Sequence, residues 1–116
     1  MVSGKDYVPE RGDLVFLNFS PQSGHEQAGR RPALVLSPRA YNRKTGLCLV
    51  CPVTRQMKGY PFEVLLPPHG DITGAILSDQ IRSIDWRARH VQFVAQAPAE
   101  AVSEALAKIA TLLSAS

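Results

Sequence analysis

The sequence predicts a small antiparallel β-barrel completed by one C-terminal helix. Short apolar segments alternate with turn residues over roughly the first 95 positions, which is typical of strands in a compact β unit. After Pro98 the apolar residues recur at a helical spacing instead. The chain has 116 residues, 45% hydrophobic and 20% charged, which suffices for one core. We therefore expect a single domain over residues 1–116.

Three strands are expected before residue 55. The first, residues 12–19, begins at a Gly-Asp turn and is rich in apolar side chains. A long polar segment, residues 20–30, separates it from the second strand, residues 32–37, which opens on a proline. Loops of this length inside a compact domain are usually functional or mobile. Residues 38–46 are expected to form a turn or a single helical turn, and residues 47–54 the third strand.

The remaining strands are shorter or less regular. Residues 60–66 carry an early proline and are predicted to form an edge strand, followed by a turn at 67–71. Residues 74–84 begin apolar and then alternate, which predicts one strand. A turn at 85–89 leads to a last short strand at 91–95.

The C-terminal helix is predicted from a stripe of apolar side chains. Pro98 suits the first helical position, and Glu100 suits the first turn, where the helix dipole favours negative charge. The stripe is expected to pack on the sheet or to form an oligomer surface. Its members are Val102, Leu106, Ile109, Leu112 and Leu113.

Charge and targeting signals narrow the functional classes. The formal net charge is +3, and arginine and lysine concentrate between residues 30 and 89, mostly beside turns. Such a surface permits a polyanionic partner. No apolar run approaches the roughly 20 residues of a membrane helix, and the first residues lack the apolar core of a signal peptide. We expect a cytoplasmic protein without a membrane segment.

The two cysteines form a C-x-x-C pattern that does not predict a metal or redox site. Cys48 and Cys51 lie in an expected strand, where residues three apart point to opposite faces. The three histidines, His25, His69 and His90, are isolated from one another, whereas a zinc site needs clustered ligands. We expect no metal and no cofactor.

Several sequence blocks, in their order and spacing between residues 12 and 89, resemble the MazF family of toxin endoribonucleases. The resemblance implies an SH3-like antiparallel barrel with a terminal helix, as in the MazF, Kid and CcdB toxins, acting as a homodimer. The blocks are Gly12-Asp13, Glu26-Gln27-Ala28-Gly29-Arg30-Arg31-Pro32-Ala33-Leu34-Val35-Leu36-Ser37, Tyr41-Asn42 before Lys44-Thr45-Gly46, Pro52-Val53-Thr54, Lys58-Gly59-Tyr60-Pro61-Phe62-Glu63-Val64, and Asp79-Gln80-Ile81-Arg82 through Trp86-Arg87-Ala88-Arg89.

The resemblance also implies an activity and a partner. The expected reaction is sequence-specific, metal-independent cleavage of single-stranded RNA, which leaves 2′,3′-cyclic phosphate and 5′-hydroxyl ends. The expected protein partner is a MazE-like antitoxin. The RNA sequence that is cleaved does not follow from the residues.

Carried over by position, the family's catalytic residues fall on Arg31, Thr54 and Glu26. A guanidinium and a hydroxyl would donate to the phosphate oxygens as negative charge builds on them. The proton acceptor stays open. Glu26 is the better candidate because a guanidinium stays protonated, which disfavours Arg31. His25 is the alternative.

RNA contacts are expected from side chains that border the basic loops, where aromatic rings stack on unpaired bases. Trp86, by contrast, is expected to pack as a lid over one end of the barrel. The expected RNA contacts are Phe19, His25, Gln27, Asn42, Lys58, Gln80 and Arg82.

Two other functions are compatible with the same fold, since a fold does not fix a function. The first is a CcdB-like toxin that poisons gyrase by binding it and has no nuclease activity. That mode uses a C-terminal aromatic end, whereas residues 112–116 contain no aromatic side chain. The second is a nucleic-acid-binding barrel without catalysis.

Overall fold

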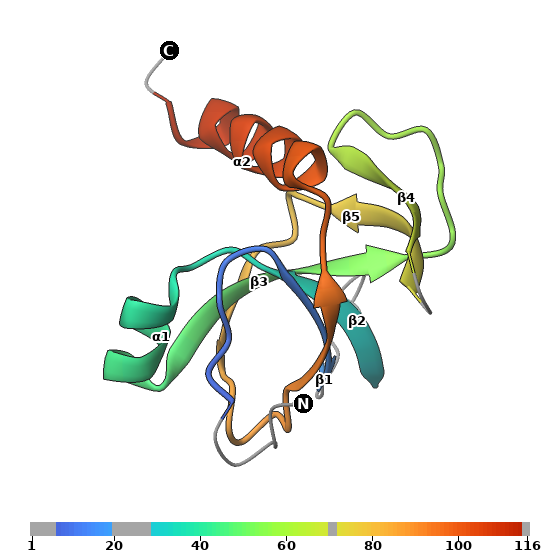
Figure 1. Ribbon diagram of the computed structural model, residues 1–116. Coiled ribbons are helices and arrows are strands. Elements are labelled where there is room, and N and C mark those ends of the chain that lie inside the picture. Colours follow the sequence, from blue (N-terminus) through green and yellow to red (C-terminus); the bar gives the residue numbers. More distant parts are fainter. Residues whose placement is uncertain (1–6, 20–28, 70–71, 115–116) are drawn as a thin grey trace.

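The computed structural model describes residues 7–19, 29–69 and 72–114, which contain seven strands and two helices (Figure 1). Their bounds are β1 (Asp13–Asn18), β2 (Arg30–Val35), α1 (Arg39–Thr45), β3 (Leu47–Thr54), β4 (Glu63–His69), β5 (Ile72–Leu77), β6 (Arg82–Asp85), β7 (Gln92–Gln96) and α2 (Ala99–Leu113). In these ranges, neither helix has the length and apolar character needed to cross a membrane.

The strands form a curled antiparallel sheet in the order β4-β5-β3-β2-β1-β7. β3 is long enough to pair with strands in two parts of this sheet. Its first residues, 47–50, pair with β6, and its last two, Val53 and Thr54, pair with β5. β3 therefore carries the sheet from one side of the half-barrel to the other (Figure 1). The predicted antiparallel β architecture with a C-terminal helix is confirmed.

Buried side chains form two clusters, on the two faces of the central strands. Along β1, Leu14 belongs to the cluster beneath α2, and Val15 belongs to the cluster that contains Trp86, as strand alternation requires. The same alternation separates Cys51 from Cys48, and the predicted divergence of the two thiols is confirmed. Burial raises the pKa of both thiols to about 12, so both are protonated at neutral pH.

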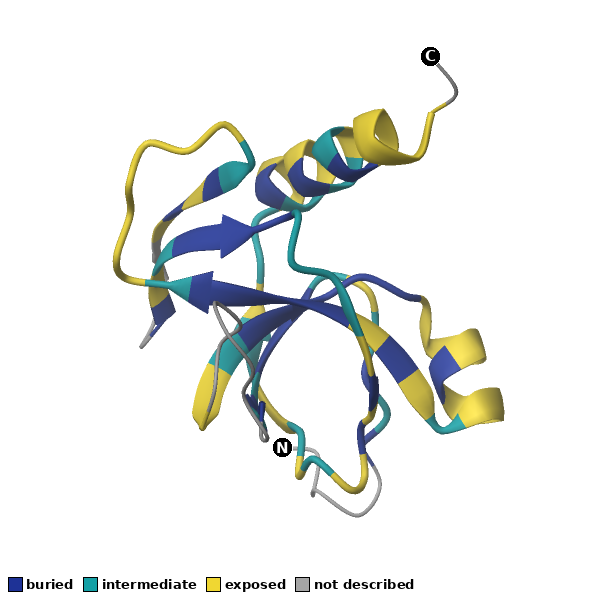
Figure 2. Ribbon diagram, turned by 180° about the vertical axis from the view of Figure 1, so that it is seen from behind, coloured by how far each residue is buried: buried dark blue, intermediate teal, exposed yellow. Residues whose placement is uncertain are grey.

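The face that α2 buries matches the predicted stripe in part: Ile109 is buried, and Val102 and Leu106 are partly buried against the same cluster. The buried residues of α2 are Ala101, Ala105 and Ile109, whereas Leu112 and Leu113 are 49% and 77% exposed. Small alanine side chains allow the helix axis to lie close to the sheet, and the last turn extends past the sheet edge (Figure 2). The two alternatives predicted for the stripe are therefore divided along the helix: Ile109 packs on the sheet, whereas Leu112 and Leu113 stay exposed, as the predicted oligomer surface requires.

The predicted strand over residues 74–84 is divided into β5 and β6. Ser78 leaves the ladder and is buried, with its hydroxyl donating to the Phe62 carbonyl oxygen at 2.6 Å. A turn follows in which the Gln80 N–H donates to the Leu77 carbonyl oxygen at 3.0 Å. Alternating polar residues here serve a buried hydrogen bond and a turn, which explains why the single-strand prediction was wrong.

Two other boundaries also differ from the sequence prediction. The predicted turn at 67–71 lies partly within β4, which continues to His69 after a register shift in its pairing with β5. The predicted turn or helical turn at 38–46 is helix α1, and it ends at Gly46 in the left-handed conformation.

Asn42, expected among the RNA contacts, is fully buried in α1. Its side-chain amide donates to the carbonyl oxygens of Pro9 at 2.8 Å and Ser37 at 2.9 Å, and its side-chain oxygen accepts the Ser37 hydroxyl at 2.6 Å. Its backbone oxygen accepts the Trp86 indole N–H at 2.9 Å. Asn42 thus joins three chain segments, and the RNA-contact prediction for it is corrected to a structural role.

Replacing Asn42 by alanine should lower the free energy of unfolding by about 3 kcal/mol, because the change leaves buried carbonyl groups unpaired. Urea unfolding followed by the fluorescence of Trp86, the single tryptophan, measures this. Arg43→Ala, the neighbouring exposed position, is the control and should stay within about 0.5 kcal/mol of the parent. Equal stability of the two variants would refute the structural role of Asn42.

Gly74 allows β5 to cross closely over the end of β3. Its φ is +121°, and a Cβ placed there would lie 2.0 Å from the Thr54 carbonyl oxygen. No side chain fits against a backbone atom at that distance. The position of Thr54 therefore depends on the absence of a side chain at residue 74.

Gly74→Ala should destabilise the fold by about 3 kcal/mol, from backbone strain and overpacking together. Gly46→Ala is the matched control, because φ is also positive there (+74°) but no atom outside its immediate chain neighbours lies within 4 Å of the added Cβ. Strain alone should make that variant about 1 kcal/mol less stable. Chemical denaturation of both variants separates backbone strain from overpacking. Similar losses of unfolding free energy in the two variants would mean that the close approach to Thr54 does not contribute to the destabilisation.

Candidate active site

Arg31 and Thr54, distant in sequence, line one cavity of about 400 Å³. β2 and β3 run antiparallel, with Ala33 opposite Pro52. Two residues beyond this pair along each strand stand Arg31, near the start of β2, and Thr54, at the end of β3. The structure therefore brings together the two predicted catalytic residues that lie in its described part.

The Thr54 hydroxyl is held by the turn that follows β3. Its Oγ1 accepts the backbone N–H of Gln56 at 3.1 Å. A hydroxyl has one proton to donate and two lone pairs, so this contact uses an acceptor site and leaves the proton for a ligand oxygen. Thr54 is half-buried, which limits the directions that its hydroxyl can take.

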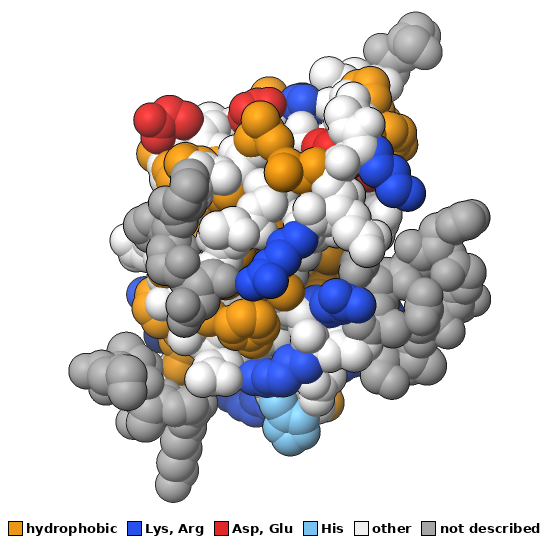
Figure 3. Space-filling view, turned by 90° about the vertical axis from the view of Figure 1, so that its right-hand side faces the viewer, with side chains coloured by type: hydrophobic (Ala, Val, Ile, Leu, Met, Phe, Trp, Pro, Cys, Tyr) orange, Lys and Arg blue, Asp and Glu red, His pale blue; other side chains and the backbone are white. Residues whose placement is uncertain are grey.

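The cavity is positively charged. Arg30, Arg31 and Arg55 line it, and none of the described residues that line it is acidic. Arg30 is held in place by neutral acceptors, the Gln92 side-chain oxygen at 2.9 Å and the His90 carbonyl oxygen at 3.2 Å. In Figure 3, several Lys and Arg side chains run from the middle of this face to its lower edge, whereas the acidic side chains lie towards the top, beside other basic ones. Such an arrangement favours an anion, and a phosphate above all.

A second cavity of about 390 Å³ adjoins the first, since Thr54 and Gln56 line both. Two of the predicted RNA contacts, Lys58 and Gln80, lie in this second cavity. Residues 54–56, which form the boundary, therefore connect the charged cavity to a neighbouring space lined by polar side chains.

Hydrogen bonds fix the far wall of this second cavity. The Tyr60 hydroxyl donates to the Asp79 carboxylate at 2.6 Å, which raises the pKa of Tyr60. The Glu63 carboxylate accepts the backbone N–H groups of Lys58 and Gly59. Tyr60 is nonetheless 47% exposed, so its ring remains accessible to a ligand.

Phe19, predicted to contact RNA, is fully buried in the cluster that contains Trp86. An apolar ring at the end of β1 is more stable in the core than on the surface. The guanidinium carbon of Arg82, also predicted to contact RNA, lies 5.5 Å from the centre of this ring. Arg82 is half-buried and does not line either cavity. The prediction for Phe19 is corrected to a core role.

Trp86 packs as predicted. It is 5% exposed, and the guanidinium of Arg87 lies 4.4 Å from its ring centre on the outer side. The ring therefore belongs to the core, and stacking on a base would require it to leave that core.

Three predicted residues, Glu26, His25 and Gln27, lie outside the described residues. Within the described ranges, no three His, Cys, Asp or Glu side chains gather at a common point. Arg30 and Gln56 line the charged cavity although the sequence did not single them out. Arg30 is next to Arg31 in the sequence, and strand alternation alone would place its side chain on the opposite face of the sheet from Arg31. For that reason the sequence did not predict it to line the same cavity.

Comparison with known proteins agrees with this geometry. Residues 10–113 match the model of the PemK-like, MazF-like toxins of type II toxin–antitoxin systems. The chain is 58% identical over 83 residues to the endoribonuclease toxin MazF of Escherichia coli K12, covering 72% of this chain and 74% of the relative. It is 41% identical over 105 residues to the endoribonuclease toxin ChpB of the same organism, covering 86% and 90% of the two chains.

Solved structures agree with the fold. The crystal structure of MazF from Deinococcus radiodurans superposes with a TM-score of 0.89 at 58% identity, covering 93% of this chain and 98% of that chain. A MazE–MazF crystal structure from the same organism gives a TM-score of 0.84 at 52% identity, covering 96% and 100%. The chain therefore belongs to the PemK-like, MazF-like family of toxin endoribonucleases of type II toxin–antitoxin systems.

Proposed function

We propose that this protein cleaves single-stranded RNA at specific sequences, without a metal ion, by attack of a ribose 2′-hydroxyl on the adjacent phosphate. The observation that carries the proposal is the shared cavity of Arg31 and Thr54, which offers a guanidinium and a hydroxyl to one anion. The names of the relatives support nuclease activity over gyrase poisoning.

The reaction needs hydrogen-bond donors whose bonds to the phosphate oxygens become stronger as negative charge builds on those oxygens. The 2′-oxygen bonds to phosphorus, the bond to the 5′-oxygen breaks, and negative charge builds on the nonbridging oxygens in between. Arg31 presents parallel N–H donors that match two such oxygens, and Thr54 adds its hydroxyl proton. One donor of this kind typically lowers the activation free energy by about 3 kcal/mol. The departing 5′-oxygen takes up a proton from solvent, so the products are a 2′,3′-cyclic phosphate and a 5′-hydroxyl.

Glu26 is the proposed acceptor of the 2′-hydroxyl proton, and this assignment rests on its match to the family pattern. A carboxylate is a better acceptor than Arg31, since a guanidinium stays protonated in proteins. His25 is the alternative base. Replacing Glu26 would then reduce the rate of the chemical step more than the affinity for RNA.

Single-stranded RNA fits the two adjoining cavities better than a duplex does. Lys58, Gln80 and the accessible ring of Tyr60 surround the second cavity, where an unpaired base could be stacked and hydrogen-bonded. A paired base would have these edges occupied. We assign RNA contact to Lys58 and Gln80, and sequence selection to this second cavity.

A homodimer and a MazE-like antitoxin complete the proposal. Large apolar side chains stay exposed, among them Met57 (51%), Leu65 (66%) and Leu113 (77%), and a two-fold interface is the commonest way to cover such surface. The solved MazE–MazF complexes of a relative support an antitoxin partner. The site of action is the cytoplasm, where the RNA substrate is present.

The test uses purified protein and a mixed-sequence RNA in excess EDTA. Cleavage should persist, because the donors that stabilise the phosphate are protein side chains, and the 5′ fragments should end in 2′,3′-cyclic phosphate. Once the motif is mapped, an oligonucleotide with a 2′-deoxy residue at the cleaved position should resist cleavage, since it lacks the nucleophile.

The control for this test is the same oligonucleotide with the 2′-deoxy residue moved two positions away, which should be cut at the normal rate. Cleavage at the 2′-deoxy position, or activity that returns only when Mg²⁺ or Zn²⁺ is added after chelation, would contradict the proposed mechanism.

A further inference from the structure

A third cavity of about 500 Å³ lies beside the charged one, outside the proposed cleavage site. Arg30, Arg87 and His90 line it, together with Trp86 and Gln92. We name it the His90 cavity. Arg30 lines both this cavity and the one that contains Arg31 and Thr54, so the two basic cavities adjoin at Arg30.

The cations of the His90 cavity are held in place by neutral groups. Arg30 donates to the oxygens of Asn18, His90 and Gln92, none of which carries charge. In the described ranges, the ion pairs are those of Arg39 with Glu10 and Lys108 with Glu104, so no carboxylate there forms an ion pair with Arg30 or Arg87. The positive charge of the guanidinium groups is thus available to a ligand.

The Arg87 guanidinium is pre-positioned by its contact with Trp86. Its central carbon lies 4.4 Å from the centre of the indole ring, which itself is buried and hydrogen-bonded to Asn42. A cation held over a rigid ring loses little freedom when it binds an anion.

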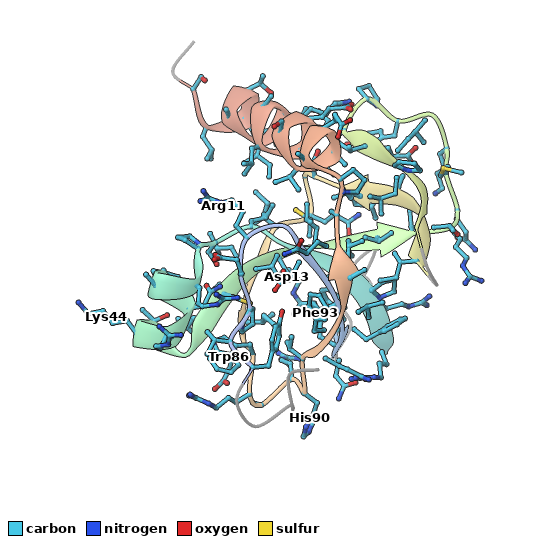
Figure 4. The ribbon with its side chains drawn as sticks, viewed as in Figure 1. Arg11, Asp13, Lys44, Trp86, His90 and Phe93 are labelled. Carbon is cyan, nitrogen blue, oxygen red and sulfur yellow. The ribbon has the colours of Figure 1, made fainter. Side chains whose placement is uncertain are left out.

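His90 has a backbone conformation that an L residue rarely adopts. Its φ is +55°, and among the described residues it is the non-glycine position with positive φ. Glycine would fit this turn without strain. Strained residues of this kind gather at functional sites, so the imidazole at this position points to a role for the side chain. In Figure 4, His90 lies at the lower edge of the molecule, on the side away from α2.

We propose that the His90 cavity binds a backbone phosphate of the RNA at a nucleotide outside the cleaved linkage. This inference rests on the proposed function. An RNA chain whose scissile phosphate lies at Arg31 and Thr54 meets Arg30 next, and then Arg87 and His90. Because Arg30 lines both cavities, one polyanionic chain fits them better than two separate small anions do.

The test measures dissociation constants for uncleavable, 2′-deoxy-substituted RNAs by fluorescence anisotropy. One RNA contains only the cleavage motif, and the others extend it by several nucleotides on the 5′ or the 3′ side. Arg87→Gln should weaken binding of one extended RNA about fivefold at ~0.1 M salt, as follows from the loss of one phosphate contact with a log–log slope of about 0.7. The salt dependence should become shallower by the same 0.7, and the short RNA should bind as before.

His90→Gly is the second variant, and it separates binding from folding. It should weaken the same extended RNA severalfold while the melting temperature stays equal or rises, because glycine relieves the backbone strain. Lys44→Gln is the matched control. It removes one charge from the exposed end of α1, far from His90, and should leave both RNAs unaffected.

Three results would overturn the proposal. Equal weakening of the short and extended RNAs would place Arg87 and His90 at the cleaved linkage. Unchanged RNA binding together with weaker binding of an acidic MazE-derived peptide would assign the cavity to the antitoxin. Unchanged binding of every ligand would mean that the cavity takes neither. Absence of RNA cleavage by the wild-type protein would contradict the proposed function instead, and these binding comparisons do not depend on it.

Discussion

The antiparallel pairing of β2 with β3 is the constraint on which the rest of the site depends. It brings the beginning of one strand to the end of the other, and so places Arg31 beside Thr54. β5 then crosses the end of β3 at Gly74, where there is no room for a side chain. The backbone of Thr54 is thereby held within the sheet, where it pairs with Ala75 of β5, and the following turn orients its hydroxyl.

The same sheet places the apolar core residues on its two faces and the basic residues at the strand ends. Alternation along the central strands sends one set of side chains under α2 and the other towards Trp86, so both faces are filled with apolar residues. Basic side chains are left to the strand ends and turns, where Arg30 and Arg31 begin β2 and Arg55 follows β3. A positive surface therefore forms at one edge of the sheet, and no charged group has to be buried in the core to form it.

Strong local patterns allowed much of the fold to be predicted from the sequence. The strand over residues 47–54, the C-terminal helix and the divergence of Cys48 from Cys51 follow from periodicity alone. The break at Ser78 did not, because a buried serine that bonds a distant carbonyl looks like the polar member of an alternating strand. The burial of Asn42 was missed for the same reason, since its partners come from segments far apart in the sequence.

The candidate site was less predictable than the fold. Arg31 and Thr54 are ordinary residues at strand ends, and only the family resemblance singled them out; tertiary pairing then places them in one cavity. The most direct test of their joint action is a double-mutant cycle on single-turnover RNA cleavage with Arg31→Ala, Thr54→Val and the double variant. Each single variant should be slowed roughly 100-fold or more, and the double variant by less than the product, because both groups act on one phosphate. Full activity of a folded Arg31→Ala variant would contradict the account.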